Sequence, residues 1–378
     1  MALSKIDTTN MIEDVPQSKL DNNINFRNII INGGMDIAQR GTSFTGLGNG
    51  DTGYTTDRFR FVESGSPTYE FTVSQSTDVP TGQGFSNSLK FDCTTADTAM
   101  ASGDTLKCEQ WIEAQNLQYL AFNSSQAKSL TLSFWVKSNK TGTYVVWFYL
   151  DDATRQISKQ YTISSADTWE KKILTIPGDT SGSISNDSGR GLLISWGLAS
   201  GTDFTSGTLP TAWENAVNAN RYVGLNVNLA DSTSNEWYVT GIQLEAGSQA
   251  SDFEFLPTDV NLQRCKRYYE KSYPLINAPG ADTDDGMVCI RIAGSFSNKP
   301  FPARFSVEKR NNSPTITLYS KVGTVNNISN MSSGTTHSSN DAINGVVNIG
   351  STGFAYVTGV TGTNTEGHCL HYTADCEL

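Results

Sequence analysis

Histidine is nearly absent from this 378-residue chain, and motifs typical of catalysis are missing. The three histidines are His337, His368 and His371, so a Ser-His-Asp or Cys-His group would have to lie near the end of the chain. No G-x-S-x-G string occurs, and neither does the E-x-D-x-x-E string with which jelly-roll glucanases place their acids. Carboxylate pairs distant in sequence stay open, but these absences predict that the protein is not an enzyme.

Charged residues are also scarce. They make up 17% of the chain, against roughly 25% in an average soluble domain. Gly, Ser, Thr and Asn occur in every stretch instead, which disfavours helices and favours strands joined by turns. The net charge of −11 argues against a general nucleic-acid binder, which needs a basic surface for phosphate. We therefore expect an all-β fold and no nucleic-acid partner.

Long hydrophobic runs are missing as well. No apolar segment approaches the ~20 residues of a membrane helix, and the start, MALSKIDTTNMIEDVP, lacks the apolar core of a secretory signal. We expect synthesis in a cytoplasm, no membrane insertion and free cysteine thiols. The six cysteines, none in a C-x-x-C pair, are Cys93, Cys108, Cys265, Cys289, Cys369 and Cys376. Cys93 and Cys108 fall in alternating patterns that predict burial, with a disulfide between them as the alternative.

Residues 1–25 form a polar arm that cannot fold alone, because too few apolar side chains oppose the ordering entropy. We expect a neighbouring subunit to hold this arm, or the arm to lie on its own domain. Its candidate anchoring residues are Met1, Leu3, Ile6, Met11, Ile12 and Leu20.

Residues 26–257 show period-2 patterns typical of strands. In SLTLSFWVKS the predicted inward set is Leu130, Leu132, Phe134 and Val136. TGTYVVWFYLDD is apolar on both faces and predicts a central strand that is covered twice. Residues 26–32 are predicted to form the first strand. About ten short strands without helical spacers predict a two-sheet sandwich or jelly roll.

Residues 258–272 break this period and predict a linking helix. Leu262, Cys265, Tyr268 and Tyr269 share one helical stripe, which we expect to face another subunit. The basic residues of this segment are interpreted as a solvated or subunit-facing side; they are Arg264, Lys266, Arg267 and Lys271. Strand patterns return in residues 273–378 and predict a smaller C-terminal β-sandwich domain.

Three patterns resemble ligand sites without their context. His368 and His371, with Cys376, could bind zinc, but in a strand the two histidines point to opposite faces. The string Gly48 to Gly53 matches G-x-G-x-x-G, yet a strand pattern follows it where a nucleotide site needs a helix. Acidic clusters at 151–152 and 282–285 lie in turns, where calcium is the alternative to solvated loops. No cofactor and no metal are predicted.

All seven tryptophans fall in the long first domain. Sugars stack on exposed aromatic rings, but core packing is the simpler explanation for most of the seven. Trp135 and Trp147 lie in mid-strand and are predicted to be core residues. Trp213, in the loop-like TLPTAWENAVNANRY, is the candidate for an exposed glycan-binding ring.

Several strings together resemble a known family. They are MALSKIDTTN, NIIINGGMDIAQRGTSF, TVSQSTDVPTGQGFSNSLKFDCTTAD, SLTLSFWVKSNKTGTY, ADTWEKKILTIPGD, VTGIQLEAG and LQRCKRYYEKSY. They are similar to tail-fibre or tail structural proteins of bacteriophages of the marine and cyanophage type. The resemblance covers residues 26 to 273 strongly and the remainder more loosely.

The resemblance implies a jelly-roll domain like carbohydrate-binding modules and a homotrimer in the virion tail. It further implies that the arm docks on tail proteins of the adaptor or nozzle type and that an outer domain meets a host-surface polysaccharide or other receptor. It supplies no catalytic residues. The chain departs from such fibres in lacking a long shaft, which leaves a structural decoration or spike on tail or capsid as the alternative. A tailspike that cuts polysaccharide is a further alternative.

Overall fold

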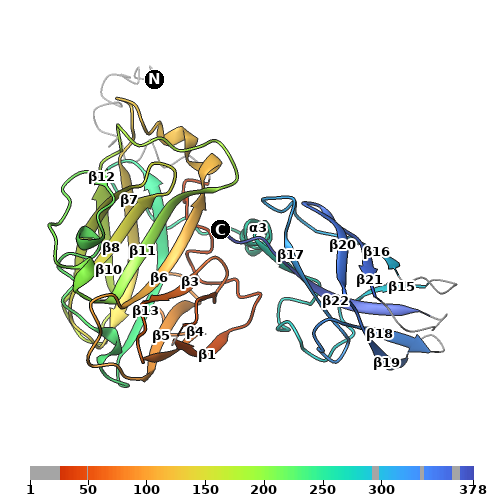
Figure 1. Cartoon of the computed structure of the whole chain (residues 1–378). Helices are drawn as coiled ribbons and strands as arrows, with labels where there is room; N and C mark the ends of the chain where they lie inside the picture. Colours follow the sequence, from red (N-terminus) through yellow and green to blue (C-terminus); the bar gives the residue numbers. More distant parts are fainter. Residues whose placement is uncertain (1–25, 49, 292–297, 333–335, 360–366) are drawn as a thin grey trace, which may run out of the picture.

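The chain folds into two β-sandwiches joined by one short helix, as the computed structural model shows (Figure 1). The structure describes residues 26–378 except 49, 292–297, 333–335 and 360–366. The predicted all-β class with a short linking helix is confirmed. The arm at residues 1–25, with Met1, Leu3, Ile6, Met11, Ile12 and Leu20, lies outside the described residues.

Two antiparallel sheets form the first sandwich. Sheet A has the order β1 (Ser43–Gly48), β4 (Glu70–Ser76), β5 (Ser88–Thr95), β13 (Glu236–Ala246), β7 (Leu130–Ser138), β10 (Glu170–Ile176). Sheet B has the order β12 (Glu214–Asn215), β9 (Arg155–Ile163), β8 (Gly142–Leu150), β11 (Arg190–Ser200), β6 (Thr105–Glu113), β3 (Arg60–Ser64), β2 (Gly53–Tyr54). Short 3-10 turns lie in the connections: η2 (Ala114–Leu120), η3 (Thr202–Phe204), η4 (Asn218–Asn220) and η5 (Leu229–Asp231).

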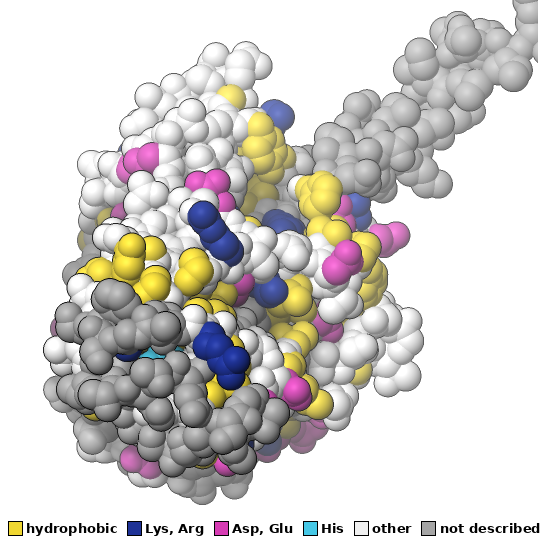
Figure 2. All heavy atoms as spheres, turned by 90° about the vertical axis from the view of Figure 1, so that its right-hand side faces the viewer, with side chains coloured by type: hydrophobic (Ala, Val, Ile, Leu, Met, Phe, Trp, Pro, Cys, Tyr) yellow, Lys and Arg dark blue, Asp and Glu magenta, His cyan; other side chains and the backbone are white. Residues whose placement is uncertain are grey.

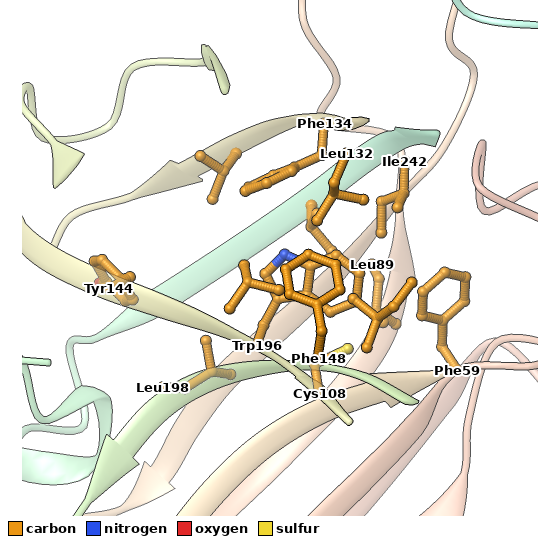
Figure 3. Close-up of a cluster of buried hydrophobic side chains, with 14 of the residues drawn as sticks. Phe59, Leu89, Cys108, Leu132, Phe134, Tyr144, Phe148, Trp196, Leu198 and Ile242 are labelled. Atoms are coloured by element: carbon orange, nitrogen blue, oxygen red, sulfur yellow. The ribbon is translucent and has the colours of Figure 1, made fainter. Parts of the chain in front are cut away.

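The main core lies between sheets A and B. Figure 3 shows Leu132 and Phe134 of sheet A pointing toward Trp196 and Phe148 of sheet B. These side chains alternate with outward ones, because successive residues of a strand face opposite sides of the sheet. The predicted inward set of β7 is confirmed, since Leu130, Leu132, Phe134 and Val136 are fully buried.

Strand β8 is covered on both faces, as its doubly apolar sequence predicts. Tyr144, Val146 and Phe148 enter the main core, while Val145 and Trp147 join a second cluster on the outer face of sheet B.

The predicted first strand at residues 26–32 is wrong, because the structure begins its strands at Ser43. The segment instead runs as irregular backbone beside β13. The backbone N–H of Ile29 donates to the Leu244 carbonyl at 2.8 Å, and the Asn28 side chain accepts from the Leu244 N–H at 3.1 Å. Side-chain and backbone bonds together satisfy the segment without a regular ladder.

The linking helix α3 (Thr258–Lys266) is shorter than the predicted 258–272. The chain turns extended at β14 (Tyr269–Lys271), because these residues pair with Asp375, Ala374 and Thr373 of β22 (His368–Asp375). Pairing with a distant strand overrides the local helical stripe.

The second sandwich is built around β22. Its larger sheet also contains β15 (Val288–Ile290), β17 (Thr315–Tyr319), β18 (Asn327–Ser332) and β19 (Thr336–Ala342). Its smaller sheet has the order β16 (Asn298–Arg304), β21 (Gly353–Thr358), β20 (Gly345–Gly350). A separate core that includes Phe301, Ile328, Phe354 and Leu370 fills the space between the sheets.

The prediction of six free thiols is wrong for one pair. Cys289 and Cys369 stand directly opposite each other on β15 and β22, with Cα atoms 4.1 Å apart, and form a disulfide. Strand pairing brings together residues that are 80 positions apart, which sequence spacing does not reveal. The predicted burial of Cys93 and Cys108 is confirmed, and both are free, as are Cys265 and Cys376.

Candidate functional site

Five of the seven tryptophans are buried, at 0–7% exposure: Trp111, Trp147, Trp196, Trp213 and Trp237. The prediction that Trp213 is exposed is therefore wrong. Its indole N–H donates to the Pro177 carbonyl at 2.7 Å, and its ring packs edge-on against Phe122. The polar, loop-like sequence around Trp213 does not indicate burial, but the loop folds back over the edge of the main core and places the ring there.

The two remaining tryptophans, Trp135 and Trp169, are half-buried and lie on the outer face of sheet A. Trp135 alternates with the inward residues Phe134 and Val136 of β7, so the strand period turns its side chain outward. Trp169 directly precedes β10, the neighbour of β7. The prediction that Trp135 is a core residue is wrong, because its side chain points away from the core. The alternation of inward and outward residues along β7 was the signal in the sequence that could have corrected it.

A polar and aromatic row crosses sheet A beside these rings. Tyr238 of β13 stands opposite Lys137 of β7 on one side and Lys90 of β5 on the other. The Lys137 ammonium lies 4.4 Å from the centre of the Tyr238 ring, and the Trp169 and Tyr238 ring centres are 6.2 Å apart. We call Trp135, Trp169, Tyr238, Lys137, Lys90, Asp78 and Glu236 the sheet A face.

Two carboxylates organise the sheet A face. Asp78 accepts a hydrogen bond from the Trp169 indole N–H at 2.9 Å and pairs with Lys137. Glu236 pairs with Lys90 at 2.6 Å and accepts from the Tyr238 hydroxyl at 2.6 Å. Both carboxylates are more than a third exposed, so their remaining lone pairs can accept from hydroxyl groups of a ligand.

The pKa shifts on this face follow from its contacts. Partial burial would raise the pKa of Asp78, but hydrogen bonds from Lys137 and Trp169 outweigh it and lower that pKa. Glu236 shows the same balance, with burial opposed by Lys90 and Tyr238, and its pKa is also lowered. Burial and the neighbouring Glu236 raise the pKa of the Tyr238 phenol. At neutral pH the face therefore combines two ionised acceptors, two ammonium donors and a protonated phenol.

The outer face of sheet B is closed by contrast. Trp147 stacks on Tyr149 with ring centres 5.1 Å apart, and the Arg221 guanidinium lies 4.2 Å over the Trp147 ring. Tyr222, on the loop between β12 and η5, is fully buried there and its hydroxyl lies 2.8 Å from Ser195 Oγ. Because the chain's own loop packs on this face, Trp147 is buried at 5% exposure, and Tyr149 beside it is half-buried.

The helical stripe predicted as a subunit interface faces the chain's own first sandwich. Cys265, Tyr268 and Tyr269 are 1–5% exposed, and the half-buried Leu262 packs against the same cluster. The Arg58 guanidinium lies 3.6 Å over the Tyr268 ring, and the Arg40 guanidinium lies 3.7 Å over the Tyr269 ring. The subunit-interface prediction is wrong for the three buried residues, because a single-sequence stripe does not say which surface covers it.

The basic residues of the linker form bonds within the chain, although Arg267 keeps 29% of its side chain exposed. Arg267 forms a bidentate pair with the buried Glu113 of β6, at 2.6 and 2.9 Å. Arg264 donates to the Asn28 carbonyl at 3.1 Å, and Lys271 donates to the carbonyls of Leu275 and Asn277. These bonds attach the linker to the first sandwich and to the loop after β14.

The histidine cluster does not assemble into a metal site. His368 Nδ1 lies 2.7 Å from Asn330 Oδ1, whereas His371 bonds Ser272 and the Thr283 carbonyl, each at 3.0 Å, and stacks on Tyr273. The two rings lie on opposite faces of β22, as predicted. Within the described part of the chain, no three His, Cys, Asp or Glu side chains gather as metal ligands would.

On the face shown in Figure 2, basic side chains of the described residues lie singly among acidic and uncharged ones. Among the helices that the structure describes, none is long and apolar enough to span a membrane.

Comparisons with known proteins give structural likeness alone. No protein-family model and no curated protein matches the sequence. The enzymatically active domain of tailspike protein 4 from bacteriophage CBA120 aligns with 58% of this chain and 21% of its own, at 14% identity and a TM-score of 0.31. The family 11 carbohydrate-binding module of a Clostridium thermocellum cellulosomal cellulase aligns with 54% of this chain and 95% of its own, at 11% identity and a TM-score of 0.27.

A family 29 carbohydrate-binding module aligns with 56% of this chain and 93% of its own, at 10% identity and a TM-score of 0.25. All three alignments cover little more than half of this chain, at TM-scores below 0.5. The chain is similar to these β proteins in part of its architecture, and the likeness carries no conclusion about function.

Proposed function

We propose that this chain is a non-enzymatic component of a bacteriophage particle that binds a host-surface glycan through the sheet A face. The observation that carries this proposal is the position of Trp135 and Trp169. They are the two tryptophans that keep exposed surface, and both lie on one sheet face with Asp78 and Glu236. Aromatic rings offer a surface for the apolar face of a sugar, and carboxylates and ammonium groups bond its hydroxyls.

The virion part of the proposal comes from the sequence strings that resemble phage tail-fibre proteins. We propose a homotrimer in which the N-terminal arm docks on tail proteins and the sandwiches project toward the host cell. The candidate docking residues are Met1, Leu3, Ile6, Met11, Ile12 and Leu20.

Glycan binding is tested with the double substitution Trp135→Ala and Trp169→Ala. We expect purified wild-type protein to bind a subset of bacterial surface glycans on an array and to block phage adsorption. The double variant should lose at least about tenfold in affinity, because each ring contributes a large apolar contact. Tyr356→Ala, an exposed aromatic of the second sandwich at 38% exposure, is the matched control. Equal binding by both variants would move the site away from sheet A.

Docking is tested by deleting residues 1–25. We expect the shortened protein to fold but not to join the particle, and sedimentation of the full chain to give the mass of three copies. Normal assembly of the shortened protein would refute the docking role.

A structural decoration without receptor contact is the alternative. In that case no glycan is bound and purified protein does not block adsorption, although the particle still contains the chain. Release of reducing ends from host polysaccharide would instead establish a tailspike activity.

A further inference from the structure

Three phenylalanines form an exposed cluster on the first sandwich. Phe85 comes from the β4–β5 connection, and Phe253 and Phe255 follow β13. Each ring contacts the other two, with centres 4.8–5.2 Å apart, yet Phe255 remains 55% exposed and the other two are half-buried. We call these three residues the phenylalanine patch.

The backbone beneath the phenylalanine patch is shaped to hold the rings in place. Gly241 of β13 has φ +61°, and a Cβ there would come within 2.5 Å of the Phe85 ring. Gly84, at φ +83°, would place a Cβ 3.1 Å from the Phe255 ring. Residues other than glycine are strained at such φ values, so the rings rest on positions that suit glycine. Because the three rings pack on this backbone, their positions are fixed without a binding partner.

The N-terminal arm leaves the described structure beside this patch. Glu254, which lies between Phe253 and Phe255 in sequence, accepts from the backbone N–H of Phe26 at 2.6 Å and of Asn28 at 2.9 Å. Phe26, the first described residue after the arm, is thus hydrogen-bonded to the segment that carries two of the three rings. Phe26 itself is 59% exposed.

The arm contains apolar side chains at the right distance from this tie. Ile24 and Leu20 lie two and six positions before Phe26, within about 7 and 20 Å of extended chain. Asp21, Asn22 and Asn23 separate them, and such residues favour turns. A short tether also gives an effective concentration in the mM range, which a free partner does not reach.

We propose that the phenylalanine patch is the seat of Ile24 and Leu20 of the chain's own arm. The arm then has two parts. The proximal part is fixed on the first sandwich, and residues 1–19, with Leu3, Ile6, Met11 and Ile12, are left to contact the particle. The inference does not depend on glycan binding, and it narrows the docking segment of the proposed function.

A cysteine cross-link tests the seat in the full chain. Among the described cysteines, four are buried thiols and two are bonded to each other, so an added surface pair reacts by itself. Under mild oxidation Leu20→Cys with Phe255→Cys should form an intrachain disulfide, seen as faster migration without reductant and a monomer mass. Leu20→Cys with Val347→Cys is the control, since Val347 is an exposed apolar residue (41%) of the second sandwich. We expect the first pair to close at least about tenfold faster.

Two outcomes overturn the proposal. Equal rates for both pairs would mean that the arm does not rest on the patch, and a cross-link between chains alone would assign the patch to a neighbour's arm.

A second measurement needs no added cysteine. Deleting residues 1–25 should increase binding of a hydrophobic dye severalfold, and Phe253→Ser with Phe255→Ser should remove that increase. No increase on deletion also contradicts the seat, whereas failure of particle docking alone would leave it intact.

Discussion

Glu113 is the most consequential carboxylate of the linker contact. It is fully buried at the end of β6 and accepts hydrogen bonds from Arg267 and from the Tyr268 hydroxyl, the latter at 2.8 Å. A charge in this position is tolerated because its oxygens are bonded by a guanidinium and a phenol. Removing the guanidinium leaves the buried carboxylate without its opposite charge.

Substituting Arg267→Ala should therefore lower the free energy of unfolding by about 3–5 kcal/mol, as is typical when one partner of a buried pair is lost. Denaturant titration followed by tryptophan fluorescence measures the change. Lys321→Ala is the control, because its pair with Asp282 is exposed to solvent and should contribute far less to stability. Equal losses would show that Glu113 does not depend on its cation.

Lys271 gives a prediction for pH. Burial lowers the pKa of its ammonium to about 8, although the nearby Asp57 carboxylate opposes this shift. Between pH 8 and the ordinary lysine pKa, the unfolded chain binds a proton that the folded chain has released. Stability from this group therefore rises with pH in that window and is constant below it.

The wild type should gain stability relative to Lys271→Met as the pH rises from 8 to 10, by up to about 1.4 kcal/mol per pH unit. Paired unfolding curves at several pH values measure the difference, and other titrating groups cancel in it. Parallel curves for the two proteins would contradict the lowered pKa.

Whether the burial of a single residue could be predicted depended on whether that residue lies in a regular strand. The inward set of β7 could be read from alternation, and the same alternation places Trp135 outward. Trp213 lies outside the regular strands, so its neighbours Phe122 and Pro177 could not be deduced from its sequence. The sheet A face combines residues of three strands and two connections, so its composition cannot be deduced without the strand order.

At the scale of elements, β22 holds the second sandwich together. It pairs with β14, β15, β17 and β18, and its inward side chains Leu370, Tyr372 and Ala374 enter that core. The three-residue strand β15 has a short ladder, and the Cys289–Cys369 bond fixes it in place. The bond closes a loop of about 80 residues, which restricts the unfolded chain strongly.

Replacing both cysteines, Cys289→Ser with Cys369→Ser, should lower the stability of the second sandwich by about 4 kcal/mol on the chain-entropy estimate. Calorimetry with and without reductant measures the effect, and the wild type under reductant should resemble the variant. Cys93→Ala, at a buried free thiol of the first sandwich, serves as the control that reductant should not mimic. An unchanged second transition would contradict the role of the bond.

Element-scale prediction succeeded for strand content and failed at the linker. Alternation in the first domain and the Gly, Ser and Asn turns were sufficient for an all-β fold. The helix was predicted too long because Tyr268 and Tyr269 continue its stripe, whereas β22 captures Tyr269 as a strand residue. The end of the helix is decided by the pairing of Tyr269 with Asp375, 106 positions further along the chain, and the sequence around Tyr269 does not indicate this partner.

At the scale of the molecule, the two sandwiches contact each other through α3 and the tail after β22 (Figure 1). Arg58 of the first sandwich bonds the Trp111 carbonyl at 2.6 Å and pairs with Glu377 of the tail. Arg310 of the second sandwich bonds the Ser188 carbonyl of the first at 3.0 Å and the Glu377 carbonyl at 2.6 Å. Because Arg58 of the first sandwich bonds the tail and Arg310 of the second sandwich bonds the first, we expect the two sandwiches to unfold together.

Substituting Arg58→Leu should uncouple them. We expect one calorimetric transition in the wild type and two in the variant, with faster proteolytic cleavage between the sandwiches. Arg155→Leu, which removes a pair with Asp179 inside the first sandwich, is the control and should destabilise without splitting the transition. A single transition in Arg58→Leu would place the coupling elsewhere.

The pairing of β14 with β22 has a consequence for recombination between related genes. The second sandwich begins at Tyr269 and ends at Asp375, and these two residues face each other in one ladder. The two ends of this domain therefore lie side by side, so the whole domain can be exchanged without moving the points at which it joins the rest of the chain. Recombination that swaps the intervening segment, and keeps the Arg58 and Glu113 contacts, would replace the second sandwich without disturbing the first. Variation among relatives should accordingly concentrate between these two positions.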